Sequence, residues 1–163
     1  MEEIQKDRDH KLPQEINIVF TESTINFIIT ASLVLHGIAH AIALMGLILQ
    51  SVGIGMTSRV QLSSWIFRSL SARAGALLAL PFWLVSTLGF IGSGISFWGV
   101  SLQSLDWSQW ATLGAIISTL GIILFSGIWP GSKSTRQSWL NTAIAMFMNI
   151  VILITQLWLK WPG

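Results

Sequence analysis

The chain contains no cysteine and no tyrosine, and only 10% of its 163 residues are charged. The absence of cysteine excludes disulfides, thiolate metal ligands and cysteine nucleophiles. Soluble domains usually carry about 25% charged residues, so a chain that is 52% hydrophobic is too apolar for an ordinary soluble globule. The formal net charge is only +2 and the basic residues flank apolar segments, so we expect no nucleic-acid partner.

Charged residues are also absent from four long apolar segments. Each segment reaches the ~20 residues needed to cross a bilayer, and they run over about 25–49, 74–97, 107–128 and 139–159. This pattern predicts an all-α integral membrane protein, with a charged N-terminal tail over 1–22 and a four-span membrane domain over 23–163. Pro81 lies inside the second segment and predicts either a kink there or a local backbone carbonyl without its hydrogen bond.

The stretch between the first two segments has helical periodicity of its own. Within about 58–70, Leu62, Trp65, Ile66 and Leu70 fall on one helical face, and Ser58 is a suitable N-cap. We therefore expect a short amphipathic helix that lies on the membrane surface between the first and second spans.

Small and polar residues recur at helical spacing in every apolar segment. Such residues let helices approach closely in lipid and form hydrogen bonds between them. The stripes are Ala39, Ala43 and Gly46; Gly89 and Ser93 with Gly92 and Ser96; Gly114, Ser118 and Gly121; and Asn141, Ala145 and Asn149. Together they predict a tight, antiparallel four-helix bundle.

The basic residues predict the direction of insertion. All the acidic residues fall on the side of the two termini and the second loop, the last of them being Asp106. The first and third loops contain no acid and carry Arg59, Arg68, Arg73, Lys133 and Arg136. Because Lys and Arg near span ends favour the cytoplasm, we expect cytoplasmic Arg-rich loops and both termini outside, in a bacterial inner membrane.

Tryptophan is unusually common, with nine copies. Most of them fall near the predicted span ends, where the amphipathic indole prefers the headgroup level. These are Trp65, Trp98, Trp107, Trp110, Trp129, Trp139, Trp158 and Trp161. We interpret them as an aromatic belt, and only Trp83 as lying well inside a span.

A histidine pair, His36 and His40, stands at the centre of the first apolar segment. Residues four apart share one helical face, and ionisable groups inside a membrane are costly and often functional. Polar residues lie at the same expected depth in the other segments: Ser86, Thr87, Ser118, Thr119 and Asn149. We predict one polar layer across the bundle at the bilayer midplane, in which Asn149 and the hydroxyls are the nearest partners for the imidazoles.

Three roles fit this pair. His36 and His40 are suited to fastening helices by hydrogen bonds. They are also suited to holding a haem, a metal ion or a chlorophyll-type pigment, although a metal site within one chain lacks further good ligands and a haem needs an opposite ligand such as Met148 or a second protomer's histidine. The third role is a proton relay.

The segment His36-Gly37-Ile38-Ala39-His40, followed by Gly46, resembles an HGxxH element in the first span of small, uncharacterised bacterial four-span membrane proteins. The resemblance covers about a dozen residues and implies no activity. The chain also lacks a phosphate-binding glycine loop, an HExxH motif and paired carboxylates in its spans. We therefore expect a small non-enzymatic integral membrane subunit or scaffold, acting in a homo-oligomer or a larger membrane complex. The alternatives are a cofactor-binding membrane protein and a small proton-linked transporter.

Overall fold

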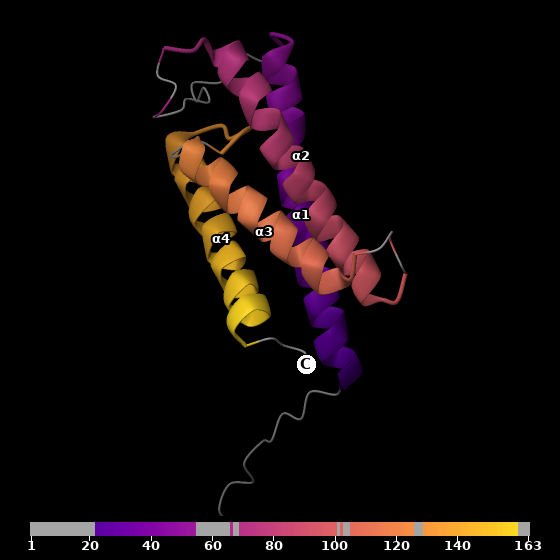
Figure 1. The fold of residues 1–163 in the computed structure, drawn as a ribbon. Coiled ribbons are helices and arrows are strands. Elements are labelled where there is room, and N and C mark those ends of the chain that lie inside the picture. The colour runs from indigo at the N-terminus through magenta and orange to yellow at the C-terminus, as the bar shows by residue number, and fades with distance from the viewer. Residues whose placement is uncertain are drawn as a thin grey trace, which may run out of the picture.

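The computed structural model describes residues 22–54, 66, 69–100, 102, 105–125 and 129–159. These residues form helices α1 (Glu22–Ser51), α2 (Ala72–Phe97), α3 (Trp107–Leu124) and α4 (Thr135–Leu153), and α4 continues into a π-helical turn, η1 (Ile154–Trp158) (Figure 1). All four helices are long and apolar enough to cross a membrane. The predicted all-helical class and the four candidate spans are therefore confirmed.

Capping residues set the starts of the later helices. Asp106 accepts a hydrogen bond from the backbone N–H of Gln109 (2.8 Å), and the Gln109 side chain accepts one from the backbone N–H of Asp106 (3.0 Å), which forms a capping box at the start of α3. The Ser134 hydroxyl caps α4 by accepting the backbone N–H of Gln137, so that α4 begins at Thr135, ahead of the predicted residue 139. At its other end α3 stops at Leu124, short of the predicted residue 128, because Phe125 leaves the helical conformation (φ −118°, ψ 42°).

Two sequence expectations fall on parts of the chain outside the described residues. The charged tail over 1–22 is described only at Glu22, where α1 begins. The interfacial helix expected over about 58–70 is described only at residues 66, 69 and 70.

Pro81 lies within α2, and the helix continues past it to Phe97.

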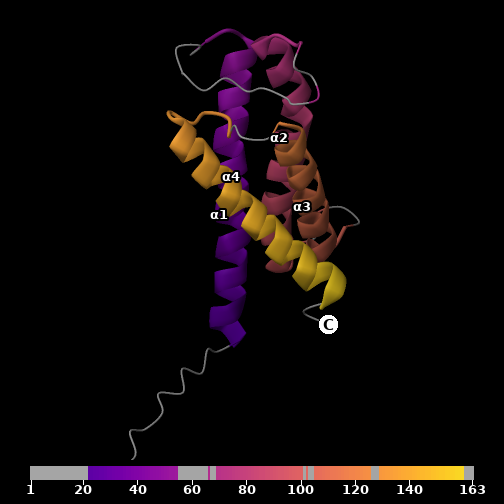
Figure 2. The same cartoon turned by 90° about the vertical axis from the view of Figure 1, so that its left-hand side faces the viewer.

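The helices differ in length and in the neighbours against which they pack. α2 lies alongside α1, and α3 lies alongside α2 (Figures 1 and 2). α4 packs against α3 and crosses α1 obliquely (Figure 2). The beginning of α1 and the end of α4 lie toward the same end of the molecule (Figure 1). α1 is the longest helix with 30 residues, and α3 is the shortest of the four with 18.

Two pairs of glycines bring backbones into direct contact. A Cβ atom added to Gly89 would lie 2.7 Å from Cα of Gly114, so α2 and α3 touch at a point where no side chain fits. A Cβ atom added to Gly46 would lie 2.8 Å from the backbone nitrogen of Gly131. The turn that precedes α4 therefore packs directly on α1.

The interior and the outer faces are both apolar. The buried core includes Leu47, Trp83, Phe90 and Phe125. On the outside, large apolar side chains are exposed on every helix, and Phe147 on α4, for example, is 65% exposed. A soluble monomer rarely exposes apolar patches of this extent, whereas hydrocarbon surroundings favour them.

Candidate functional site: the buried histidine network

The two histidines lie on the buried face of α1. His36 is 7% exposed and His40 is 1% exposed. Their ring centroids are 4.9 Å apart with an interplanar angle of 86°, and the ring of Phe90 on α2 packs against both of them, at 4.3 Å from His36 and 5.3 Å from His40. The closeness of the two imidazole rings follows from the four-residue separation of His36 and His40 on one helix.

A continuous hydrogen-bond network connects the two imidazoles through other helices. Nε2 of His36 lies 3.1 Å from Oδ1 of Asn149 on α4. The Asn149 amide nitrogen donates to Oγ of Ser118 on α3 at 2.7 Å. The same Ser118 Oγ lies 3.1 Å from Nε2 of His40. The network therefore links α1, α3 and α4 at the centre of the molecule.

The direction of these hydrogen bonds assigns the protons on His36. Because the Asn149 nitrogen donates to Ser118, the Asn149 oxygen faces His36 and accepts a hydrogen bond from its Nε2–H. In an uncharged imidazole the other ring nitrogen, Nδ1, is then an acceptor. His36 thus offers one acceptor atom beyond the network.

The environment of His40 differs from that of His36. Its Nδ1 is buried and has no hydrogen-bond partner among the described residues. Its ring contacts Trp129 at a centroid distance of 5.1 Å, and Trp129 in turn packs against Trp83 at 6.2 Å. Trp129, which we expected in the aromatic belt, is only 6% exposed within the chain. Its backbone N–H donates to the hydroxyl of Ser138, which fixes it to the first turn of α4.

The remaining residues of the expected polar layer do not join the network. The hydroxyls of Ser86 and Thr87 each donate to a carbonyl one turn earlier in α2, those of Phe82 and Trp83, at 2.7 Å. The hydroxyl of Thr119 is buried without a partner among the described residues. Met148, the residue before Asn149, is half-buried on α4.

Metal binding by this cluster would need donors from elsewhere. The groups hydrogen-bonded to the histidines are an amide and a hydroxyl, which are poor zinc ligands. Within the part of the chain that the structure describes, no group of three or more His, Cys, Asp or Glu residues is placed to hold a metal ion. A metal centre at these histidines would therefore need ligands from outside the described residues.

A groove of about 300 Å³ opens beside the network, between α1 and α4. Its lining includes His36 and Ile42 from α1, Trp129, and Gln137, Asn141 and Ile144 from α4. Sequence reasoning placed Asn141 in a packing stripe and did not single out Gln137. The available signal was their separation of four residues, which puts both amides on one face of α4.

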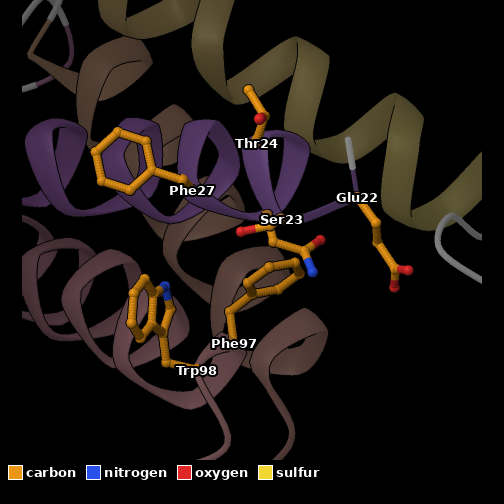
Figure 3. A pocket seen from close by; sticks show the side chains of 7 residues that line it. Glu22, Ser23, Thr24, Phe27, Phe97 and Trp98 are labelled. Carbon is orange, nitrogen blue, oxygen red and sulfur yellow. The ribbon is translucent and has the colours of Figure 1, made fainter. Parts of the chain in front are cut away.

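A second hollow, of about 750 Å³, lies at the end of the molecule where α1 begins and α2 ends. Figure 3 shows Phe97 and Trp98 on one side of the α1 ribbon and Thr24 on the other. The carboxylate of Glu22 points away from the aromatic rings (Figure 3). Because these side chains do not converge and nearly all are exposed, the buried histidine network is the better candidate site.

No protein-family model, no curated protein and no solved structure matches this chain.

Proposed function

We propose that this protein is a non-enzymatic integral membrane subunit or scaffold that works in an oligomer or in a larger membrane complex. The observation that supports this function is the use of both histidine Nε2 atoms in hydrogen bonds within the chain. Hydrogen bonds between spans stabilise membrane bundles by roughly 0.6–2 kcal/mol each. His36 and His40 are then fastening residues that fix the relative positions of α1, α3 and α4.

The proposal includes an arrangement in the membrane. The four helices form an antiparallel bundle in a bacterial inner membrane, with both termini outside and the Arg-rich first and third loops in the cytoplasm. The start of α1 and the end of α4 lie toward the same end of the molecule, as an even number of spans requires (Figure 1). Lys133 and Arg136 are exposed just before and within the first turn of α4, which suits a basic cytoplasmic edge. The interfacial helix over about 58–70 would lie on the same surface.

The network also bears on cofactor binding. Ligation of a haem, a metal ion or a chlorophyll-type magnesium through Nε2 of either histidine would replace one of the hydrogen bonds to Asn149 or Ser118. Such a bond would leave a buried amide or hydroxyl without its partner, which costs about 1–3 kcal/mol. The hydrogen-bonded state therefore favours the fastening role over ligation through Nε2.

The decisive experiment is purification of the wild-type protein and of His36→Ala and His40→Ala in mild detergent. Absorption spectra, elemental analysis and the mass of the native complex are measured for each. We expect a colourless protein without stoichiometric metal that purifies as an oligomer or with other membrane subunits, and lower thermal stability for both variants.

Two results would overturn the proposal. A haem or pigment absorption band, or a stoichiometric metal, that is lost in either variant would establish the cofactor-binding alternative. Proton flux into liposomes that depends on pH and disappears in His36→Ala would establish the proton-linked transporter.

A further inference from the structure

The hydrogen bonds of the histidine network all run in one direction. Nε2–H of His36 donates to Oδ1 of Asn149, and the amide nitrogen of Asn149 donates to Oγ of Ser118 at 2.7 Å. A serine hydroxyl has one hydrogen to donate. Among the described residues, the only acceptor in hydrogen-bond contact with the Ser118 hydroxyl is Nε2 of His40, at 3.1 Å. Ser118 therefore donates to Nε2 of His40.

This direction assigns opposite tautomers to the two histidines. In an uncharged imidazole only one ring nitrogen carries a proton. Nε2 of His36 carries it, because that atom donates to Asn149. Nε2 of His40 accepts from Ser118, so the proton of His40 is on Nδ1. Two histidines whose ring centroids are 4.9 Å apart on one helix are thus protonated at different atoms.

The Nδ1–H group of His40 is the open end of this chain of hydrogen bonds. The Nδ1 atom is buried and has no hydrogen-bond partner in the part of the chain that the structure describes. The rings of Phe90 and Trp129 pack against His40 at centroid distances of 5.3 and 5.1 Å, and neither ring carries a conventional acceptor. A buried N–H without an acceptor is unfavourable, so a molecule that accepts this hydrogen bond stabilises the fold.

The surroundings of His40 restrict what that molecule can be. His40 is only 1% exposed, so the site is enclosed and has no room for a lipid headgroup or a larger cofactor. The buried polar residues among those described are serine, threonine, asparagine and histidine, so an anion would find no fixed counter-charge. The chemistry that fits is a small neutral acceptor, and water is the one that proteins hold at such buried groups.

We propose that His40 binds one internal water molecule, which accepts the hydrogen bond from Nδ1–H, and that Ser118 is the residue that fixes the tautomer required for this binding. The water extends the network by one member beyond His40. The inference rests on the fastening role proposed above, because a histidine that ligated a haem or a metal ion through Nε2 could not keep these hydrogen bonds.

The test is solid-state NMR of the full chain in lipid bilayers at neutral pH, with isotopically labelled histidine. Protonated and unprotonated imidazole nitrogens have widely separated chemical shifts, so the spectrum reports the tautomer of each ring. The chain has three histidines, and His10→Ala removes the signal of the one outside the spans. Water contact is measured as magnetisation transfer from water protons. We expect His36 protonated at Nε2, and His40 protonated at Nδ1 with transfer from water to that proton.

Variants at serine positions isolate the role of the Ser118 hydroxyl. Ser118→Ala should shift the tautomer ratio of His40 toward the Nε2–H form by about tenfold, the effect of one lost hydrogen bond. His36 should stay protonated at Nε2, because its acceptor on Asn149 is unchanged. Ser118→Thr keeps the hydroxyl and should preserve the Nδ1–H form of His40. The matched control is Ser86→Ala, since that buried hydroxyl donates to the carbonyl of Phe82 and should affect neither histidine.

Two results would overturn the inference. Protonation of His40 at Nε2 in the wild-type protein would reverse the direction of the chain of hydrogen bonds. An Nδ1–H signal that receives no magnetisation from water would exclude the water molecule. Failure of the fastening role is read separately, because absorption and elemental analysis of the same sample would then reveal a haem or a stoichiometric metal ion.

Discussion

The side-chain oxygen of Asn149 lies 3.1 Å from Nε2 of His36, although the two residues are 113 positions apart in the chain. The amide nitrogen of the same Asn149 donates to Ser118 on α3. One asparagine on α4 therefore holds both α1 and α3, and its side chain is fully buried. Helices that are separated in sequence are thus joined at a single polar centre.

Replacement of Asn149 by leucine should destabilise the bundle. The substitution leaves the Nε2–H of His36 and one acceptor position of Ser118 unpaired in the interior, which we expect to cost about 1–2 kcal/mol. The measurement is the free energy of unfolding in mixed detergent micelles with increasing dodecyl sulfate. Asn141→Leu is the matched control on the same helix and should change stability by less than half as much. Equal losses in the two variants would contradict the network's structural role.

Substitution of Gly89 by alanine should separate α2 from α3. The new methyl group would lie 2.7 Å from Cα and 2.9 Å from the backbone nitrogen of Gly114, and neither backbone atom has a side-chain rotation to relieve the clash. We expect a destabilisation of about 1–3 kcal/mol. Gly92→Ala is the control, because its methyl group would meet only the Trp110 ring at 3.3 Å or more. Thermal denaturation of both variants tests the prediction, which fails if Gly92→Ala is the less stable.

The cap of α3 should make stability depend on pH in the acidic range. The Gln109 backbone N–H and the Ser108 hydroxyl, both donating to the carboxylate of Asp106 at 2.8 Å, hold the pKa of Asp106 below its ordinary value. A carboxylate with a lowered pKa in the folded state stabilises the fold above the ordinary aspartate pKa of about 3.9, and this contribution is lost as pH falls through the folded value.

Comparison of Asp106→Asn with wild type isolates this contribution. Asparagine is also a good N-cap but does not titrate, so the difference in melting temperature between the two proteins should shrink when pH falls from 7 to 3. Asp106→Ala should lose about 1 kcal/mol at pH 7. A difference between wild type and Asp106→Asn that is constant with pH would show that the carboxylate charge does not contribute.

The proposed orientation in the membrane can be tested by labelling single introduced cysteines, because the natural chain contains no cysteine. Val100→Cys and Lys133→Cys place a thiol at two exposed positions in the second and third loops. A membrane-impermeant maleimide applied to intact bacterial cells without an outer-membrane barrier should label Val100→Cys. Lys133→Cys should be labelled only after the cells are opened. The reverse pattern would place the Arg-rich loops outside.

Much of the fold follows from composition and spacing. Four charge-free segments predicted four helices because a bilayer-length apolar run has few other folds, and Gly46, Gly89 and Gly114 mark places where backbones meet. The helix starts were harder to predict. Ser134 lies outside the apolar run that defined the fourth segment, so its capping hydrogen bond was not apparent from hydropathy.

The site was predictable only in part, for a physical reason. Asn149, Ser118, Ser86 and Thr87 were grouped because each lies near the centre of its apolar segment. Hydropathy locates the segments, and position within a segment gives only the expected depth in the membrane. Depth carries no information about whether a hydroxyl turns toward a neighbouring helix or back to its own carbonyl, as Ser86 and Thr87 do. Trp129 was expected at the headgroup level because it lies near a span end, but its burial against His40 within the chain is a tertiary feature that hydropathy does not indicate.

The unequal helix lengths have a consequence for the surrounding lipid. At 1.5 Å per residue, α1 with 30 residues is about 45 Å long and α3 with 18 residues about 27 Å. A hydrocarbon layer of about 30 Å cannot match both helices when they are upright. The first turns of α1 carry Phe27 and Ile28, which are 61% and 48% exposed, so this end of the helix has apolar surface beyond the length of α3. The bilayer is therefore expected to be thicker on the α1 side and thinner beside α3, which gives this small protein a preferred position wherever membrane thickness varies.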